Sequence, residues 1–402
     1  MSIEKNSTAA RRLQTTWAAA ALLMGLALGG CSTPQASRST AELPFDQAVA
    51  HVTDALVAQT GDMVGFRAKR VLVLDPMVDV GSGQQTVATQ TLQRRVAERL
   101  GAKHDTVEIL PFQQDTLARA GYLLTGTLER TQRAASARGP LRIQLALTDV
   151  RSGKVTAQAS ALARDDGVDN TPLAYDQDSP VLAQDKVIDG YVRTTATPPG
   201  QPADAHYMTR LAAAPVIAGA TALYNAGRYQ EALTQYDAAA ALPAGDQLRV
   251  LSGLYLSSVK LERGAEAEQA FGKIVAYGIQ NRQLGVKFLF NPGSTVFWSD
   301  AKVSGPYAMW LRQIASLSTQ AKVCMDIVGH TSRTGAEPVN DALSLQRANF
   351  IRQKLSAESA VLGERSLAVG RGFRENIIGS GTDNAVDALD RRVEFKIIDC
   401  KA

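Results

Sequence analysis

The chain has 402 residues, of which 45% are apolar, and its 43 Lys and Arg nearly balance its 39 Asp and Glu. A chain of this length and composition can bury two or three hydrophobic cores. The net charge of +4 argues against the strongly basic surface that nucleic-acid binding requires. We therefore expect a multidomain α+β protein without a nucleic-acid partner.

Residues 1–30 predict an export signal. Lys5, Arg11 and Arg12 precede an uninterrupted apolar run from Trp17 to Leu28. At about 1.5 Å per residue this run is too short to cross a hydrocarbon layer about 30 Å thick. The run is therefore typical of a signal peptide rather than a transmembrane helix.

The end of this run, Leu28-Gly29-Gly30-Cys31, resembles the lipobox of bacterial lipoproteins. The resemblance implies cleavage before Cys31 and acylation of that cysteine. The alternative is an ordinary secretory signal with an incidental cysteine. Ser32 follows instead of Asp, which by the sorting pattern of such lipoproteins indicates the outer membrane. We expect residues 31–42 to be a lipidated tether on that membrane, with the body of the chain facing the periplasm.

Residues 43–163 predict a small α+β domain, because helical and alternating apolar patterns follow one another. Phe45, Val49, Val52 and Leu56 fall on one helical face. The expected elements are a helix over 45–56, a strand over 70–74, a helix over 86–100, strands over 106–110 and 122–129, and a β-hairpin over 141–162.

This order of elements resembles the small α+β domain of envelope lipoproteins such as the curli-secretion lipoprotein and the penicillin-binding-protein activator. Asp75-Pro76, at the end of the first strand, and the Leu-Thr-Asp-x-x-x-Gly-Lys pattern over 147–154 carry the likeness. The resemblance implies a module that binds protein partners. Residues 164–204 then show little periodicity and many Asp, Pro, Thr and Gly, so we expect a linker or a wrapping loop.

Residues 205–280 return to a helical period that repeats. The run Gly227-Arg228-Tyr229-Gln230-Glu231-Ala232, followed by Tyr236, resembles a tetratricopeptide repeat, in which small residues let two helices cross closely around an aromatic ring. Ala267 and Phe271 repeat Ala232 and Tyr236 at a spacing of 35 residues. Two repeats bury less core than independent stability requires, so we expect them to pack on a neighbouring domain. A plain helical-hairpin spacer is the alternative.

Residues 284–402 predict the order β-α-β-α-β-β. The expected elements are a strand over 286–290, a helix over 299–317, a strand over 322–328, a helix over 340–355, and strands over 366–369 and 391–398. Cys324 and Cys400 each lie at one end of an expected strand. In an oxidising compartment they can form a disulfide, and two free buried thiols are the alternative.

Three motifs in this segment resemble the OmpA-like family: Gly329-His330-Thr331, Asn340-x-x-Leu343-Ser344 and Asp390-Arg391-Arg392-Val393-Glu394. The resemblance implies binding to diaminopimelate in the peptide stem of peptidoglycan. The ammonium of that ligand needs a carboxylate, and its carboxylate needs an arginine fork. The site residues that the resemblance implies are Thr331, Ser332, Asn340, Arg347, Arg391 and Arg392.

Arg347 lies between Leu343 and Ile351 on an otherwise apolar helix face. A guanidinium there is costly unless it reaches an anion or backbone carbonyls. An internal ion pair with Asp383 or Asp390 is the alternative to ligand binding. For Asn340 the alternative is a helix N-cap, and for one of the two neighbouring arginines it is a solvent-facing position on a strand.

Ser332 departs from the family pattern, which has Asp at this position. A serine hydroxyl can accept a hydrogen bond from an ammonium but cannot neutralise its charge. Loss of one partly buried charge pair removes about 2–5 kcal/mol of binding free energy. Glu337 is a candidate replacement. Two functions therefore remain open: a tether between outer membrane and peptidoglycan, and an envelope scaffold that no longer binds the wall.

Catalysis, cofactors and metals are not expected. The four histidines, His51, His104, His206 and His330, show no metal-ligand spacing. Gly81-Ser82-Gly83 lacks the lysine and hydroxyl residue of a phosphate loop. No set of nucleophile, base and acid falls within one predicted domain, so we expect a non-catalytic protein.

Overall fold

The computed structural model describes residues 37–60, 70–132, 138–378, 381, 383 and 386–400. The expected signal peptide over 1–30 and the expected lipidation site, Cys31, lie outside these residues. None of the helices in the described ranges has the length and apolar content that crossing a membrane requires.

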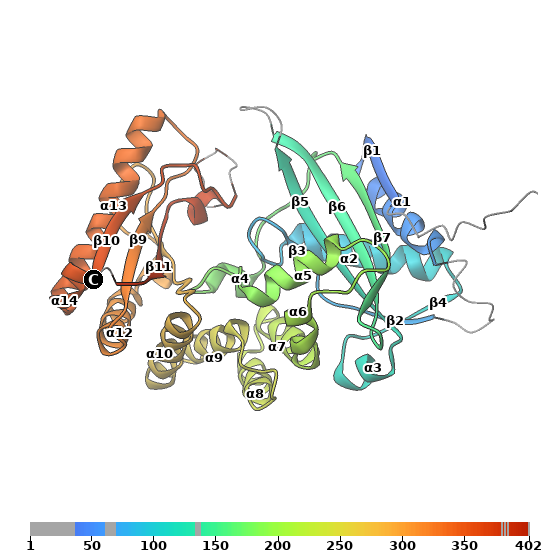
Figure 1. Ribbon diagram of the computed structural model, residues 1–402, viewed down its shortest axis with the longest axis horizontal. Helices are drawn as coiled ribbons and strands as arrows, with labels where there is room; N and C mark the ends of the chain where they lie inside the picture. The colour runs from blue at the N-terminus through green and yellow to red at the C-terminus, as the bar shows by residue number, and fades with distance from the viewer. Residues whose placement is uncertain are drawn as a thin grey trace, which may run out of the picture. The chain divides into compact units, whose positions relative to one another are not determined.

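A mixed sheet forms the N-terminal part of the described chain (Figure 1), with the order β1-β7-β6-β5-β2-β4 and β3 beside β5. β2 runs parallel to β4 and β5, whereas β5, β6 and β7 are antiparallel neighbours. The first strand begins inside the expected tether and pairs in parallel with β7. The strands are β1 (Ser37–Leu43), β2 (Arg70–Leu74), β3 (Val78–Asp79), β4 (Val107–Leu110), β5 (Tyr122–Gln132), β6 (Arg138–Asp149) and β7 (Lys154–Ala163).

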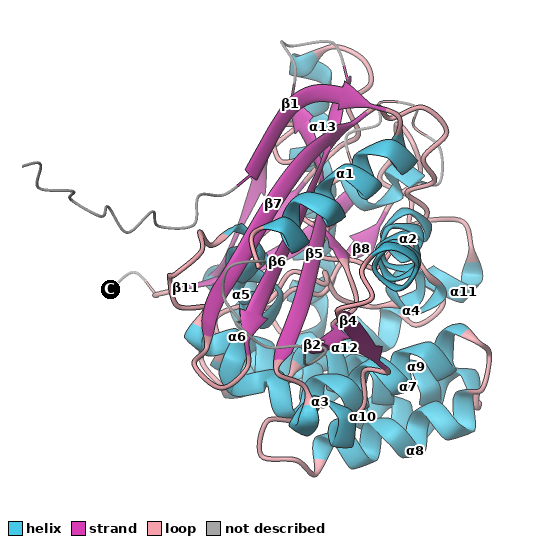
Figure 2. Ribbon diagram, turned by 90° about the vertical axis from the view of Figure 1, so that its right-hand side faces the viewer, coloured by secondary structure: helices cyan, strands magenta, loops and turns pink. Residues whose placement is uncertain are grey.

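Apolar side chains lie on both faces of this sheet, because alternate residues of a strand point in opposite directions. Leu72 and Leu74 of β2 belong to the core that α1 (Phe45–Ala58) and α2 (Val87–Lys103) cover. Val73, between them, belongs to a second core on the other face. Figure 2 shows α1 crossing the strands of the first face.

Residues 164–204, which we expected to be a linker or a wrapping loop, contribute to the core on the second face of the sheet. This segment instead contains α4 (Ala174–Asp178) and α5 (Lys186–Ala196). The Tyr191 hydroxyl of α5 accepts from the Gly126 N–H at 2.8 Å and donates to the Gly126 carbonyl at 3.0 Å. The apolar face of α5 is short and polar residues surround it, so the composition of the segment did not indicate a helix.

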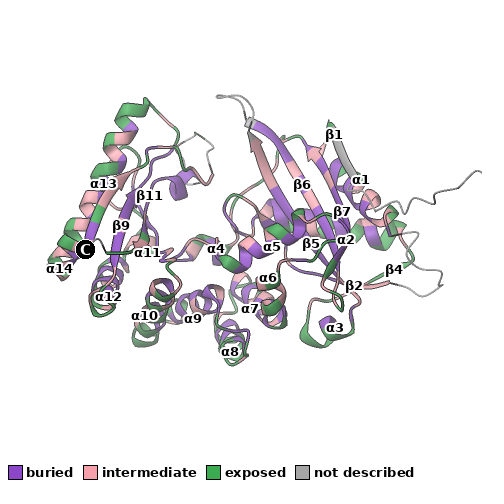
Figure 3. Cartoon of the chain, viewed as in Figure 1, coloured by how far each residue is buried: buried purple, intermediate pink, exposed green. Residues whose placement is uncertain are grey.

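The helical region packs as successive antiparallel neighbours, and Figure 3 shows it exposed on its outer side. Tyr236 of α8 lies against Gly253 of α9, so an aromatic ring and a small residue meet between these two helices. Phe271 of α10 stacks on Trp310 with ring centroids 5.1 Å apart, which joins this region to the C-terminal core. The helices of this region are α6 (Ala205–Arg210), α7 (Ala214–Asn225), α8 (Tyr229–Ala240), α9 (Leu248–Lys260) and α10 (Gly264–Gln280), whereas α3 (Gln114–Arg119) lies between β4 and β5 in the N-terminal part.

The C-terminal region confirms the predicted β-α-β-α-β-β order, with the sheet order β10-β9-β11-β8. Its first expected helix is split at Gly305-Pro306, and its second begins at Glu337 rather than at Asn340. The elements are β8 (Phe288–Leu289), α11 (Ala301–Ser304), α12 (Tyr307–Gln320), β9 (Cys324–Gly329), α13 (Glu337–Glu358), α14 (Val361–Arg365), β10 (Ser366–Gly370) and β11 (Arg392–Ile398).

A disulfide joins Cys324, at the start of β9, to Cys400, just after β11. These two strands are antiparallel neighbours, and Ile398 pairs with Cys324 in their register. The two cysteines are 76 residues apart in sequence. The bond therefore closes a loop that contains most of the C-terminal domain.

We expect the double substitution Cys324→Ser/Cys400→Ser to lower the free energy of unfolding of this domain by about 4 kcal/mol, because a loop of this length restricts the unfolded chain strongly. Urea unfolding followed by fluorescence of Trp298 and Trp310 measures the effect. The parent protein with a reductant should show the same lowered midpoint. An unchanged midpoint in both samples would show that the bond adds no stability.

We expect Gly253→Ala to destabilise the helical region by about 1–3 kcal/mol, although alanine favours helices. A Cβ at Gly253 would lie 2.3 Å from the Tyr236 ring. Gly219→Ala on α7 is the matched control, since its Cβ would meet its nearest atom only at 3.9 Å. Thermal unfolding followed by circular dichroism should show a lowered midpoint for the first variant only, and equal midpoints would contradict this packing.

Candidate functional site

The candidate site forms where β9 ends and α13 crosses it. A Cβ at Gly329 would lie 2.0 Å from the Ser344 carbonyl oxygen, so only glycine permits this close approach of strand and helix. The residues after Gly329 then form a loop that returns to α13 at Glu337. This geometry places Arg347, in the third turn of α13, directly beneath the loop.

Arg347 is completely buried and donates hydrogen bonds to three backbone carbonyls in two segments of the chain. Its Nε bonds Ser294, its Nη1 bonds His330 and its Nη2 bonds Asn291, each at 2.9 Å. Among the described residues none of these hydrogen bonds goes to a carboxylate, so Arg347 does not form the alternative ion pair with Asp383 or Asp390. Burial, and then the nearby charge of Arg391, lower the pKa of Arg347 to about 10, so it stays charged at neutral pH.

A carboxylate lies beside Ser332, although the sequence has none in that loop position. The Ser332 hydroxyl donates to Oδ1 of Asp383 at 2.6 Å, and Nη1 of Arg391 donates to the same oxygen at 2.7 Å. Among the described residues, Oδ2 of Asp383 accepts one long hydrogen bond, 3.4 Å, from the Thr334 hydroxyl. Asp383 thus brings an acid into the loop from 51 residues further along the chain.

We did not predict this role of Asp383 from the sequence. We considered Asp383 only as an internal ion-pair partner of Arg347. Glu337, the replacement considered instead, accepts from Nη1 of Arg374 at 2.7 Å on the exposed side of α13. The positive φ of Asp383, 56°, marks a left-handed position that aspartate tolerates better than most residues. Such a position gives no signal of its contacts in the sequence.

The two neighbouring arginines are both buried, so neither faces solvent. Arg391 bonds Asp383 and also donates from Nε to the Phe290 carbonyl at 3.2 Å. Arg392 turns away from Asp383 and pairs with Glu394, with Nε 3.1 Å from Oε2. Only Arg391 therefore joins Ser332 and Arg347 in one cluster.

Thr331 and Asn340 shape the loop. Nδ2 of Asn340 donates to the carbonyls of Thr334 at 2.7 Å and Ala336 at 3.1 Å. Asn340 therefore fixes the loop from within the first turn of α13, and Ala336 takes the N-cap position instead. The Thr331 hydroxyl is buried and has no hydrogen-bond partner among the described residues.

His330 forms a second cluster under the loop, with Nε2 3.2 Å from Oε1 of Glu394 and Nδ1 3.9 Å from Oε2 of Glu375. Burial lowers the pKa of His330. Burial alone would raise the pKa of Glu394, but the His330 hydrogen bond and the Arg392 charge lower it to about 2. In the described chain these three residues are the one group spaced to ligate a metal ion. The guanidinium of Arg392 on Glu394 opposes a bound cation, so the cluster fits a structural network better.

Comparisons with known proteins agree on the C-terminal region. Residues 289–388 match the model of the OmpA family. Over 115 residues the chain is 34% identical to outer membrane porin F of Pseudomonas aeruginosa. The aligned residues cover 29% of this chain and 31% of porin F. The chain thus spans about a third of the length of this curated relative.

Solved structures also match this region. The peptidoglycan-associated lipoprotein from Burkholderia pseudomallei is 25% identical, with a TM-score of 0.23, over 28% of this chain and 89% of that chain. The cell wall anchor of the T6SS from Pseudomonas aeruginosa is 21% identical, with a TM-score of 0.23, over 32% of this chain and 97% of that chain. The residues of the candidate site and the match over 289–388 together identify the C-terminal part of this chain as an OmpA family domain.

Proposed function

We propose that this protein is a non-catalytic tether between a bacterial outer membrane and peptidoglycan. The OmpA family domain binds the diaminopimelate-containing peptide stem, as its family resemblance implies. A lipid on Cys31 holds the other end in the membrane. Porin F, the relative with 34% identity, is by its name an outer-membrane protein. The sheet domain and the helical pairs, which resemble tetratricopeptide repeats, recruit protein partners of the envelope.

The observation that carries this proposal is the position of Asp383. Its Oδ1 is held by Ser332 and Arg391, while Oδ2 retains capacity for a ligand ammonium. The Asp383 side chain is 27% exposed, whereas that of Arg391 is 1% exposed. A ligand arriving from solvent therefore meets the acid first. The serine at 332 then serves to orient the carboxylate that the family pattern places at that position itself.

The arginine side of the site is less accessible. Arg347 already holds the carbonyls of Asn291 and Ser294, which lie in the turn after β8. A guanidinium has five N–H groups, so two of those on Arg347 remain for a ligand carboxylate. Because Arg347 has no exposed surface, the turn over 291–294 must move before a ligand carboxylate can reach it.

The complete burial of Arg347 is also the observation that favours the second candidate function. In that case the guanidinium serves only to hold three backbone segments together. The domain then keeps its fold without binding peptidoglycan, and the protein is a scaffold for an envelope assembly. The two functions differ in one measurable property, which is binding to purified sacculi.

We expect the parent protein to co-sediment with purified diaminopimelate-type sacculi and Asp383→Asn to bind them about 30-fold or more weakly, because the ligand ammonium loses its charged partner. Asp399→Asn is the matched control. It removes the same charge from a side chain that is 90% exposed, at the opposite end of β11 from the loop. Binding by this control should equal that of the parent.

A parent protein that stays in solution would reject the tether and leave the scaffold. A parent that sediments together with an equally bound Asp383→Asn would keep the tether but place its site elsewhere. Circular dichroism of each variant checks that the fold is retained.

We expect Ser332→Asp to weaken sacculus binding, although it restores the family residue. Its carboxylate would lie within about 3 Å of Asp383, where two like charges repel. The exchange Ser332→Asp/Asp383→Ser returns one acid and one hydroxyl to the pair and should recover most of the binding. The same sedimentation assay measures both variants. Tighter binding by Ser332→Asp alone would show that Asp383 does not act as the ligand's carboxylate.

A further inference from the structure

A polar pocket lies among the N-terminal sheet, the segment of α4 and α5, and the helices α7 and α9. The pocket has a volume of about 680 Å³, part of which is open to solvent. Within it, the centres of water molecules can occupy about 40 Å³. One water molecule needs roughly 10–15 Å³ of the volume that its centre can occupy. The pocket therefore holds either a few waters or one small molecule.

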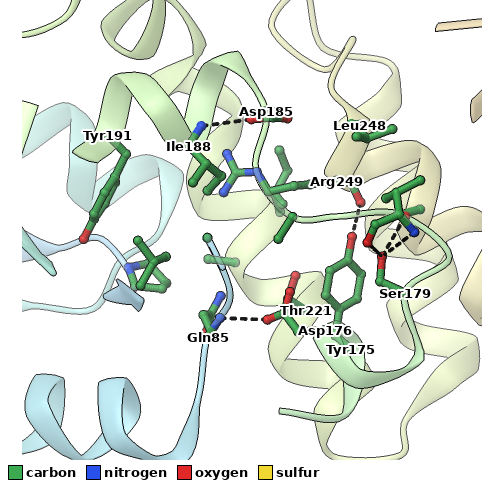
Figure 4. A pocket seen from close by; sticks show the side chains of 18 of the residues that line it. Gln85, Tyr175, Asp176, Ser179, Asp185, Ile188, Tyr191, Thr221, Leu248 and Arg249 are labelled. Atoms are coloured by element: carbon green, nitrogen blue, oxygen red, sulfur yellow. Dashed lines mark hydrogen bonds between the residues drawn. The ribbon is translucent and has the colours of Figure 1, made fainter. Parts of the chain in front are cut away.

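Charged side chains of both signs line this pocket without touching. Asp75 enters from the end of β2, Asp176 from α4, Asp185 from the start of α5 and Arg249 from α9. Figure 4 shows the Arg249 side chain extending from α9 toward α5, with Asp185 on one side and Asp176 on the other. The charge of Arg249 lowers the pKa of all three carboxyl groups, yet among the described residues it forms no ion pair with any of them.

Each carboxylate is held by the protein on one side. The Tyr207 hydroxyl donates to Asp75. The Gln85 N–H donates to Oδ2 of Asp176 at 2.9 Å. The N–H groups of the first turn of α5 donate to Oδ1 of Asp185, both at 2.9 Å. The carboxylates are therefore fixed in position, as in a preformed binding site.

Two atoms of the pocket residues are buried without a hydrogen-bond partner: Oδ2 of Asp185 and Nε of Arg249. Asp185 is only 2% exposed. A buried polar atom that makes no hydrogen bond is unfavourable, even where other atoms of the same group have partners. Burial also raises the pKa of Asp75 to about 6 and that of Asp176 to about 7, which shows how incompletely their charges are compensated. Oδ2 of Asp185 therefore lacks a hydrogen-bond donor, and Nε of Arg249 lacks an acceptor.

We propose that this pocket binds a small α-amino acid, with the ligand carboxylate on Arg249 and the ligand ammonium on Asp185 and Asp176. A zwitterion supplies the missing acceptor and the missing donor in one molecule. A simple amine would leave Nε of Arg249 without an acceptor, and a simple carboxylate would leave Oδ2 of Asp185 without a donor. Among the described residues these carboxylates do not approach closely enough to form a metal site. The size of the pocket limits the ligand to a few non-hydrogen atoms, as in glycine or alanine.

The test is isothermal titration calorimetry of the purified protein with four probes: glycine, alanine, ethylamine and propionate. We expect the two amino acids to bind at least 10-fold more tightly than the amine or the acid, because each of these loses one charged hydrogen bond. This series uses the unaltered protein, so it does not depend on the folding of a variant. It also does not involve peptidoglycan, so its outcome is separate from that of the sacculus assay.

Two substitutions place the ligand in the pocket. Asp185→Asn keeps an oxygen that can cap α5 but removes the charge, and we expect it to weaken amino-acid binding by about 10- to 100-fold. Arg249→Gln should weaken it by a similar factor. Asp204→Asn is the matched control, since Asp204 caps α6 through the Tyr207 N–H and does not line the pocket. Its affinity should equal that of the parent.

The absence of binding by either amino acid would overturn the proposal and assign the pocket to bound water. Ethylamine that binds as tightly as glycine would overturn it as well, because Arg249 would then take no part. Equal loss of affinity in Asp185→Asn and Asp204→Asn would show that helix capping, and not contact with the ligand, controls binding.

Discussion

The three carbonyl contacts of Arg347 determine the geometry of the C-terminal domain around the loop. One guanidinium joins the turn after β8, the end of β9 and the helix α13, at 2.9 Å in each case. Without it, the buried carbonyl of His330 and the partly buried carbonyls of Asn291 and Ser294 would lose this donor, and loss of the partner of a buried carbonyl costs about 1–3 kcal/mol. The loop position that presents Ser332 to Asp383 depends on this junction. An apolar residue at 347 would therefore change the fold of the site as well as its charge.

Periodicity predicted most of the C-terminal fold, because each element there carries its own signal. β9 is apolar apart from Asp326, and α13 has apolar residues at helical spacing. The start of α13 was predicted too late. Asn340 is a favoured N-cap type, but Pro338 is equally typical of a first helical turn, and the helix begins ahead of it. Two start signals two residues apart cannot be ranked without the contacts of the loop.

The contacts that define the two candidate sites were not predictable from one sequence. Asp383 reaches Ser332 across 51 residues, and the pocket collects Asp75, Asp176 and Arg249 from segments separated by whole domains. Local patterns report which face of an element is buried, but they contain no information on which distant side chain meets it. The helix α5 was missed for a related reason, since so short an apolar face becomes recognisable only when the second face of the sheet is known to need a cover.

The two sites differ in how a ligand would interact with their charges. At the OmpA family site the protein already holds the charged groups, Asp383 through Ser332 and Arg391, and Arg347 through backbone carbonyls. A ligand must displace the turn over 291–294 before it can use the remaining N–H groups of Arg347 together with Oδ2 of Asp383. Its affinity is therefore the difference between new and displaced contacts, and its association is limited by movement of the turn over 291–294. In the pocket, Asp185 and Arg249 keep unpaired atoms in place. A ligand there displaces only water, and the protein has already provided the ordering of its charged groups, so even a very small molecule can bind measurably.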